Sequence, residues 1–348
     1  MAHTEPWHTV GQDEPVDVHV HLTPPLMLKS RGREESWRPT VIRDEKGRQL
    51  RVEVGGRTMN SIVSELSRIE VVLELSARRG VGALIVSPWV STIPSGTDRG
   101  RAIAICRAQN EVLLSACRQQ PGRVAAFGAV PLQDPEAAAE MLVEVVGSGL
   151  LGVEVTPCVE GRWLGEPAFE PFWGAAEELG AVVFVHPGTH GLGLDVFGEY
   201  YLWNAVANPV ETAAAAAQLV MAGVLERHEG LKVVLAHGGG VLPAVMGRLE
   251  RAFAVRPEAR QRLSQGPAAS FRRLRFDTVT HDVALLALLV GKVGADHVLL
   301  GSDHPFDMGT DDPVGEVRAL GLSPADEHLI LRGNAVSLCP KLPHGVPS

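Results

Sequence analysis

Residues 181–188 have the sequence AVVFVHPG, an apolar strand-forming run that ends in a histidine and is closed by Pro and Gly. After residue 80, similar short β-branched runs alternate with longer segments rich in Ala, Leu and Glu. The runs begin at Val16, Gly82, Val124, Gly152, Ala181, Leu231, Arg273 and His297. Most are apolar at both even and odd positions, as expected of strands buried on both faces. The alternation predicts βα units around a parallel sheet.

Helical segments connect several of these runs. They include AIAICRAQNEVLLSACRQQ at residues 102–120, PVETAAAAAQLVMAG at 209–223 and DVALLALLVGKVG at 282–294. Eight strands with helical crossovers fit a closed barrel better than an open sheet. We therefore predict an α/β fold, a (β/α)₈ TIM barrel, in one domain over residues 1–348.

One interval breaks the alternation. Residues 23–67 are polar and contain PTVIRDEKGRQLRVEVGGR, in which two strand-like runs flank the turn sequence Asp-Glu-Lys-Gly. We predict a small β-hairpin inserted after the first strand, close to the active face of the barrel.

Composition and charge exclude several classes of partner. The chain has 32 Lys and Arg against 41 Asp and Glu, a net charge of −9, and its basic residues are scattered, so we expect no nucleic-acid partner. The first fifteen residues contain no apolar run flanked by positive charge, and no apolar stretch is long enough to span a bilayer. We expect no membrane partner and, by default, a cytoplasmic location. Cys106, Cys117, Cys158 and Cys339 have no CxxC spacing, so we interpret them as reduced thiols.

Histidines and an aspartate stand at the ends of the predicted strands. His19 and His21 are two apart in VDVHVHL, so their side chains leave the same face of a strand. His186 ends FVHP, His237 ends LAHGGG and Asp303 ends LLGSDHP. Because all strand ends of a barrel meet at its C-terminal mouth, we expect these five residues to lie together.

The residue types in this set indicate a metal centre. Three imidazoles and one carboxylate suit one divalent ion, zinc first and manganese or iron(II) as alternatives. Such an ion lowers the pKa of bound water. His237 is the candidate general acid or base, because histidine titrates near neutral pH. Asp303 is either a metal ligand or mainly a proton-transfer group.

Longer motifs carry a family resemblance. The stretches VDVHVHL, AVPLQDPEAA, AAEELGAVVFVHPG, NPVETAAAA, LAHGGGVLPAVMGRLERAF and LLGSDHPF resemble motifs of the aminocarboxymuconate semialdehyde decarboxylase family, in the amidohydrolase superfamily. The resemblance extends from about residue 16 to residue 340. It implies a (β/α)₈ barrel, one divalent metal and nonoxidative removal of a carboxylate from an unsaturated or aromatic acid.

The resemblance also assigns roles to single residues. It places His19, His21, His186 and Asp303 on the metal-ligand positions and His237 on the acid/base position. Arg248 would bind the substrate carboxylate of a neighbouring subunit, which implies a homodimer; the alternative is a surface residue in an ion pair. Arg57 would be a second carboxylate-binding arginine, as guanidinium groups suit a small-molecule carboxylate.

One departure from the family pattern bears on the substrate, and one departure from the wider superfamily bears on the number of metal ions. Gly188 follows His186 and Pro187, where related decarboxylases commonly have a Trp, and His190 is either a pocket contact or a loop residue. The fourth strand run, GVEVTP at residues 152–157, has no lysine that could bridge two metals, so we expect a mononuclear site. His281 and His304 either line the pocket or pack near it.

Three functions remain compatible with the sequence. The first is the decarboxylase. The second is a metal-dependent hydrolase or hydratase that acts on an ester, lactone, amide or double bond, because barrel loops can change the reaction while the metal ligands stay the same. The third is a binding module without catalysis. The absence of a GxSxG motif argues against a serine hydrolase.

Overall fold

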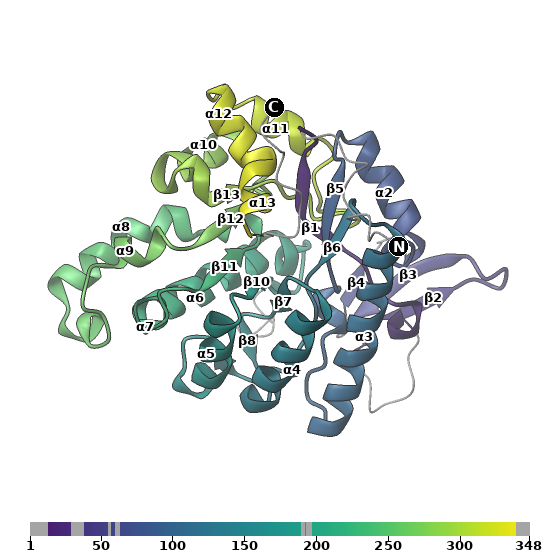
Figure 1. Ribbon diagram of the computed structural model, residues 1–348, viewed down its shortest axis with the longest axis horizontal. Coiled ribbons are helices and arrows are strands. Elements are labelled where there is room, and N and C mark those ends of the chain that lie inside the picture. The colour runs from purple at the N-terminus through teal and green to yellow at the C-terminus, as the bar shows by residue number, and fades with distance from the viewer. Residues whose placement is uncertain are drawn as a thin grey trace, which may run out of the picture.

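A computed structural model describes residues 13–28, 38–54, 57–59, 63–188, 192 and 197–338 of the chain. Each of the eight predicted runs contains a parallel strand. The strands are β1 (Val16–His21), β5 (Ala83–Ser87), β6 (Val124–Ala126), β7 (Gly152–Val155), β10 (Val182–Val185), β11 (Lys232–Leu235), β12 (Arg275–Asp277) and β13 (Val298–Leu299). They follow one another around the centre of the molecule in chain order (Figure 1).

The strands close into a barrel. They form two hydrogen-bonded groups, β1-β5-β6 and β7-β10-β11-β12-β13. A parallel bridge between Gly128 and Val153 joins β6 to β7. On the other side, the Val18 amide donates to the carbonyl of Leu300 (2.9 Å), just beyond β13. The predicted (β/α)₈ fold is confirmed.

Helices surround the barrel on the outside (Figure 1). The longer ones are α2 (Ile69–Arg78), α3 (Arg99–Gln119), α4 (Pro135–Ser148), α5 (Glu170–Glu178), α6 (Asn208–Met221), α8 (Leu242–Val255) and α10 (Val283–Val293). The short ones are α1 (Val63–Leu66), α7 (Val224–Arg227), α9 (Pro267–Phe271), α11 (Pro313–Arg318), α12 (Pro324–His328) and α13 (Asn334–Leu338). Asp98, Asp134 and Asp282 cap α3, α4 and α10 by accepting backbone N–H groups of the first turn.

Two sets of buried apolar side chains explain why the strands are apolar at both even and odd positions. One set, including Val183, Val185 and Leu235, packs against the helices. The other, including Phe127 and Phe184, packs within a second cluster built largely from strand residues. This double burial stabilises the barrel at roughly 25 cal/mol for each Å² of apolar surface removed from water.

The interval between β1 and β5 contains the predicted hairpin. Strands β2 (Thr40–Arg43) and β3 (Gln49–Val54) are antiparallel, and β4 (Arg57–Met59) adds a third strand to them. At the turn, the Gly47 amide donates to the Asp44 carbonyl (2.9 Å), and Gly47 has a φ of +77°, which favours glycine. Two shorter strands, β8 (Cys158–Val159) and β9 (Arg162–Trp163), form a separate hairpin after β7.

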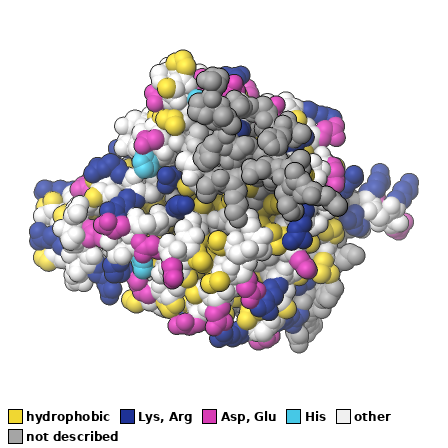
Figure 2. All heavy atoms as spheres, in the orientation of Figure 1, with side chains coloured by type: hydrophobic (Ala, Val, Ile, Leu, Met, Phe, Trp, Pro, Cys, Tyr) yellow, Lys and Arg dark blue, Asp and Glu magenta, His cyan; other side chains and the backbone are white. Residues whose placement is uncertain are grey.

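The surface agrees with the charge pattern of the sequence. Acidic and basic side chains are intermixed on the face drawn in Figure 2, with no basic stripe across it. In the ranges that the structure describes, every helix is too short or too polar to cross a membrane. The prediction of one domain over residues 1–348 stays a prediction.

Candidate metal centre

Four of the predicted residues converge at the C-terminal mouth of the barrel. His19 and His21 lie at the end of β1, His186 follows β10 directly and Asp303 lies in the loop after β13. Each offers one ligand atom, and these atoms all lie within 4.8 Å of one another. All four side chains are buried. The set has the composition and the closeness of a site that could hold a metal ion.

The distances among three of the four donors match those of ligands around one ion, and the fourth, His186, lies farther away. Nε2 of His19 lies 3.2 Å from Nε2 of His21, and the Asp303 Oδ1 lies 3.2 Å and 3.1 Å from these two nitrogens. Nε2 of His186 is 4.0 Å from the same oxygen. Two atoms that each lie about 2.1 Å from a common ion are separated by roughly 3.0–3.4 Å.

The hydrogen bonds of the Nδ1 atoms of His19 and His21 explain why a cation is needed beside their Nε2 atoms. Nδ1 of His19 lies 2.6 Å from Asp277 Oδ2, and Nδ1 of His21 lies 3.1 Å from the Pro88 carbonyl. Both acceptors hold a proton on Nδ1, so in the neutral imidazoles the two Nε2 atoms face each other with lone pairs. Nε2 of His186 is buried and has no hydrogen-bond partner among the described residues. A divalent ion would satisfy all three nitrogens.

The electrostatics of Asp303 and His186 favour the forms of these two side chains that bind a cation. Burial raises the pKa of Asp303, but His19, with hydrogen bonds from His19, His21 and His237, holds it well below its ordinary value. Burial lowers the pKa of His186 well below its ordinary value, and the neighbouring histidines lower it further. Burial also lowers the pKa of His19, yet Asp303 and Asp277 outweigh burial and raise it. The centre therefore attracts positive charge, which a proton or a metal ion can supply.

Asp277, at the end of β12, was missed by the sequence analysis. Its Oδ2 accepts from His19 Nδ1 and from the His237 amide (3.0 Å). Its Oδ1 accepts from the amides of Gly238 (2.8 Å) and Val279 (3.1 Å). The same carboxylate thus orients one candidate metal ligand and the backbone of the candidate acid/base residue. The position of Asp277 at the end of a predicted strand was the feature of the sequence that could have identified it.

His237 lies beside the four donors. Its Nε2 is 3.3 Å from Asp303 Oδ2, and its φ is +55°, a conformation that costs a non-glycine residue energy. The glycines after it allow the loop to approach α6 closely: a Cβ on Gly240 would lie 1.9 Å from the Pro209 carbonyl oxygen. The Gly238–Gly240 run is therefore a point of close backbone approach.

A cavity of about 350 Å³ opens beside His237 and Asp303. Its other described lining residues are Asn204, Ala205, Asn208, Pro209, Gly240, Val241, Val279, Thr280, His281, Leu285 and Met308. His281 thus lines the pocket. His304 does not belong to the described lining; its Nδ1 accepts from Arg79 (2.8 Å), and burial together with the Arg79 charge lowers its pKa to about 4. The cavity is the candidate substrate site.

A second buried carboxylate, Glu154 on β7, was also missed. Its Oε2 lies 3.8 Å from His21 Nδ1, and burial raises its pKa to about 7. It borders a cavity of about 20 Å³ with Gln133, and the side-chain oxygen and nitrogen atoms of both residues lack hydrogen-bond partners in the described part of the chain. The space and the polar atoms suit one buried water molecule.

The structure describes the side chain of one of the two predicted substrate-binding arginines, Arg248, and not that of the other, Arg57. Arg248 is exposed on α8 and forms no ion pair with any residue that the structure describes. Arg57 begins β4, but its side chain lies outside the described residues, as does His190. The Gly188 amide donates to Glu211 Oε2 (2.9 Å), at the position where the family pattern has Trp.

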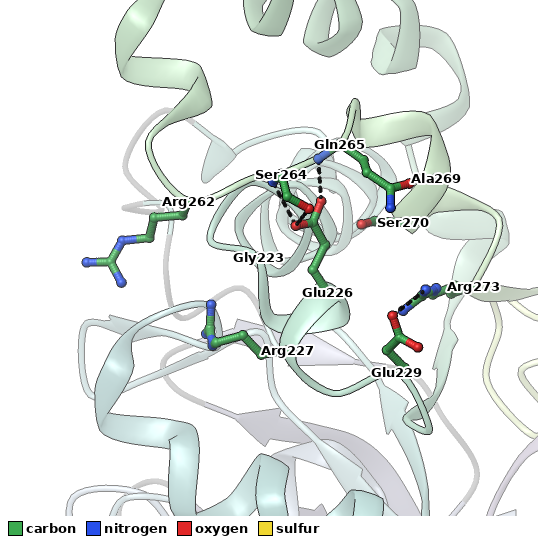
Figure 3. Close-up of a pocket in the computed structure, with 10 residues that line it drawn as sticks. All are labelled: Gly223, Glu226, Arg227, Glu229, Arg262, Ser264, Gln265, Ala269, Ser270 and Arg273. Atoms are coloured by element: carbon green, nitrogen blue, oxygen red, sulfur yellow. Dashed lines mark hydrogen bonds and ion pairs between the residues drawn. The ribbon is translucent and has the colours of Figure 1, made fainter.

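Another cleft, of about 340 Å³, lies near α7 and α9, before the amino ends of β11 and β12 (Figure 3). Glu226 points at the loop opposite and accepts from the amide and hydroxyl of Ser264 and the amide of Gln265. Arg273 donates to Glu229 (3.2 Å). These charged side chains form hydrogen bonds between residues that line the cleft, so we assign no ligand to the cleft.

The fold and the four donors define a class of protein, a (β/α)₈ barrel with a metal centre at the C-terminal ends of its strands. The family model described as amidohydrolase matches residues 16–338, and the chain therefore belongs to the amidohydrolase family.

Known decarboxylases resemble the chain over most of its length. It is 31% identical over 326 residues to the 2-amino-3-carboxymuconate-6-semialdehyde decarboxylase of Dictyostelium discoideum, which covers 92% of this chain and 90% of that protein. It is 32% identical over 282 residues to the gamma-resorcylate decarboxylase of Rhizobium sp. strain MTP-10005, covering 76% and 84%. The structure of a 2,6-dihydroxybenzoate decarboxylase complexed with 2,6-dihydroxybenzoate matches with a TM-score of 0.77 and 27% identity, covering 94% of this chain and 99% of that one. The predicted family resemblance is confirmed.

Proposed function

We propose that the chain is a metal-dependent, nonoxidative decarboxylase, a carboxy-lyase, of an unsaturated or aromatic carboxylic acid. One observation carries the proposal: three Nε2 atoms and the Asp303 carboxylate converge beside His237 at the edge of one cavity. The names of the similar proteins support the reaction type, because they are decarboxylases of acids of this class.

His19, His21, His186 and Asp303 would hold the metal. A donor set of three imidazoles and one carboxylate suits zinc, and manganese or iron(II) accept the same donors. When bound, the ion supplies a Lewis acid that holds the carboxylated substrate and stabilises negative charge. Asp277 fixes the proton of His19 on Nδ1 and so keeps Nε2 available.

His237 handles the proton of the reaction. When the bond between the ring or diene carbon and the carboxylate carbon breaks, its electron pair stays on the substrate and carbon dioxide leaves. The same carbon then needs one proton. His237 lines the cavity and lies 3.3 Å from Asp303 Oδ2, so the pair can hold a proton at the cavity and release it to that carbon. Water from the solvent restores the proton for the next turnover.

The substrate carboxylate or a second acidic group would meet arginine from another copy of the chain. Arg248 is exposed on α8, as a residue that reaches a neighbouring subunit must be. A homodimer would complete the site, and Arg57 would add a second guanidinium from the inserted strands. Sedimentation of the wild type and of an Arg248→Ala variant, with the activity of each, tests whether the dimer and the arginine are needed.

Product analysis on the metal-loaded protein tests the reaction itself. Unsaturated and aromatic acids are offered, and loss of one carbon dioxide with uptake of one proton is expected. Asp303→Ala should abolish the release of carbon dioxide, whereas Asp282→Ala, which removes only the cap of α10, should retain it. Addition of water to esters, lactones, amides or double bonds, with no acid decarboxylated, would identify a hydrolase or hydratase and contradict the proposal.

A further inference from the structure

The guanidinium of Arg79 contacts the side chain that follows a candidate metal ligand. Arg79 is the residue directly after α2, in the layer of helices outside the barrel (Figure 1), and its Nη1 lies 2.8 Å from Nδ1 of His304. A guanidinium has no acceptor atom, so Arg79 donates and Nδ1 of His304 accepts. His304 comes directly after Asp303, one of the four metal donors. The contact therefore joins an outer helix to the loop that carries this donor.

The hydrogen bond from Arg79 is what holds the His304 ring. The His304 side chain is buried, and its Nε2 has no hydrogen-bond partner in the ranges that the structure describes. Within those ranges, the bond from Arg79 is the one hydrogen bond to this ring. Without the guanidinium, both ring nitrogens would be buried and unpaired, which is costly. The ring would then be expected to leave its present position.

Backbone hydrogen bonds connect the position of His304 to the strand that carries two other donors. The His304 carbonyl accepts from the amide of His21 (2.8 Å), and the Asp303 amide donates to the carbonyl of His19 (2.9 Å). These bonds fasten the loop after β13 to β1. A shift of His304 would therefore move the Asp303 carboxylate relative to the two imidazoles.

Asp303 has a backbone conformation that its neighbours must maintain. Its φ is +59°, which costs a non-glycine residue energy and persists only where the surroundings hold it. On the amino-terminal side, the Ser302 amide donates to the buried carboxylate of Asp17 (3.1 Å). On the carboxyl-terminal side, Arg79 holds the ring of His304. The strained residue thus lies between two anchored neighbours.

An ordinary surface role does not account for Arg79. Its other contact, from Nη2 to Asp311 Oδ1, is 3.5 Å long and involves a fully exposed carboxylate, and such pairs contribute little. The preceding residue, Arg78, is a typical surface arginine, because its side chain is 69% exposed and pairs with Glu74 one turn earlier in α2. The Arg79 side chain is only 23% exposed. Its main contact among the described residues is therefore the one with His304.

We propose that Arg79 is a positioning residue of the metal centre, which binds the His304 ring and so holds the Asp303 carboxylate in place beside His19 and His21. The inference rests on the proposed function for the metal ion at these donors. It extends the set of residues that support metal binding from the barrel mouth to the end of α2.

Metal affinity tests the inference without any substrate. Zinc binding is measured by competition with a chelator, under conditions where circular dichroism shows the metal-free form of each variant to be folded. Arg79→Met, which keeps a long side chain without donors, should bind zinc about tenfold more weakly, at the lower end of the range for groups that hold metal ligands. Arg79→Lys, which keeps a donor, should recover most of this loss. Arg78→Met makes the same change one residue earlier and should bind zinc as the wild type does.

Two double variants test whether the effect passes through His304 and Asp303. His304→Phe removes the acceptor, so adding Arg79→Met should cause no further loss of zinc affinity. Asp303→Ala removes the carboxylate and leaves three imidazoles, which suffice to hold zinc. Adding Arg79→Met to this variant should again cause no further loss. A residue that only stabilised the fold would lower the affinity by the same factor in every background.

Three results would overturn the inference. They are unchanged zinc affinity in Arg79→Met, an equal loss in Arg78→Met, and a further tenfold loss in either double variant. Carbon dioxide release from unsaturated and aromatic acids is measured separately. If the zinc affinities follow the prediction and no acid is decarboxylated, the proposed reaction fails while the positioning role of Arg79 stands.

Discussion

Replacing Asp277 by Asn should loosen both the metal centre and the loop that carries His237. The carboxylate accepts four hydrogen bonds, from His19 Nδ1 and from the amides of His237, Gly238 and Val279. Asparagine has one oxygen and one NH₂ group, and the NH₂ group cannot accept. In either orientation of the amide, two of the four donors lose their acceptor.

The expected loss of stability follows from these two bonds. Each hydrogen bond to a charged group contributes about 1.5–3 kcal/mol, so Asp277→Asn should lower the free energy of unfolding by about 3–6 kcal/mol. Where the NH₂ group faces His19, the ring proton moves to Nε2 and blocks that ligand atom. Loss of such a partner weakens metal binding by about 10–100-fold.

Urea unfolding and competition with a metal chelator measure the two effects separately. Asp282→Asn is the matched control, because it makes the same chemical change at the exposed cap of α10, where Asn caps equally well. Metal competition is measured at a temperature where all variants have the far-UV circular dichroism of the wild type. Equal stability and equal metal affinity in Asp277→Asn and wild type would refute the reasoning.

Three further predictions concern other parts of the chain. His237→Asn should lower turnover about 10²–10⁴-fold with unchanged metal content by elemental analysis, and loss of the metal would contradict its placement outside the donor set. Gly240→Ala should destabilise the fold by more than about 2 kcal/mol in urea unfolding, because its Cβ would overlap Pro209, while Gly247→Ala, with open space around it, should be neutral or stabilising. Burial raises the pKa of Glu226, but its hydrogen bonds outweigh burial and lower that pKa below its ordinary value. The stabilisation from Glu226 is therefore present above about pH 4.5 and is lost on acidification. Glu226→Gln should remove this pH dependence of the free energy of unfolding, and an unchanged pH profile would refute the prediction.

The barrel and the metal donors could be predicted because both depend on simple periodic patterns. Strands buried on two faces leave short apolar runs, and a parallel barrel brings all their carboxyl ends to one mouth. His19, His21, His186 and Asp303 could therefore be grouped from strand ends alone. The third strand of the insertion, Arg57–Met59, was missed because three residues are too short for a pattern.

The residues around the donors could not be predicted in the same way. Asp277 and Glu154 are single carboxylates in strands, and the sequence does not show whether the even or the odd positions of those strands face the barrel interior. The roles of Arg248 and Arg57 depend on a second copy of the chain and stay predictions.

Anomalous diffraction from crystals of the zinc- or manganese-loaded protein tests the metal centre most directly. The account predicts one strong peak about 2.0–2.3 Å from Nε2 of His19, His21 and His186 and from a carboxylate oxygen of Asp303. A fully loaded crystal with the peak elsewhere, or with two of these side chains turned away from it, would contradict the account.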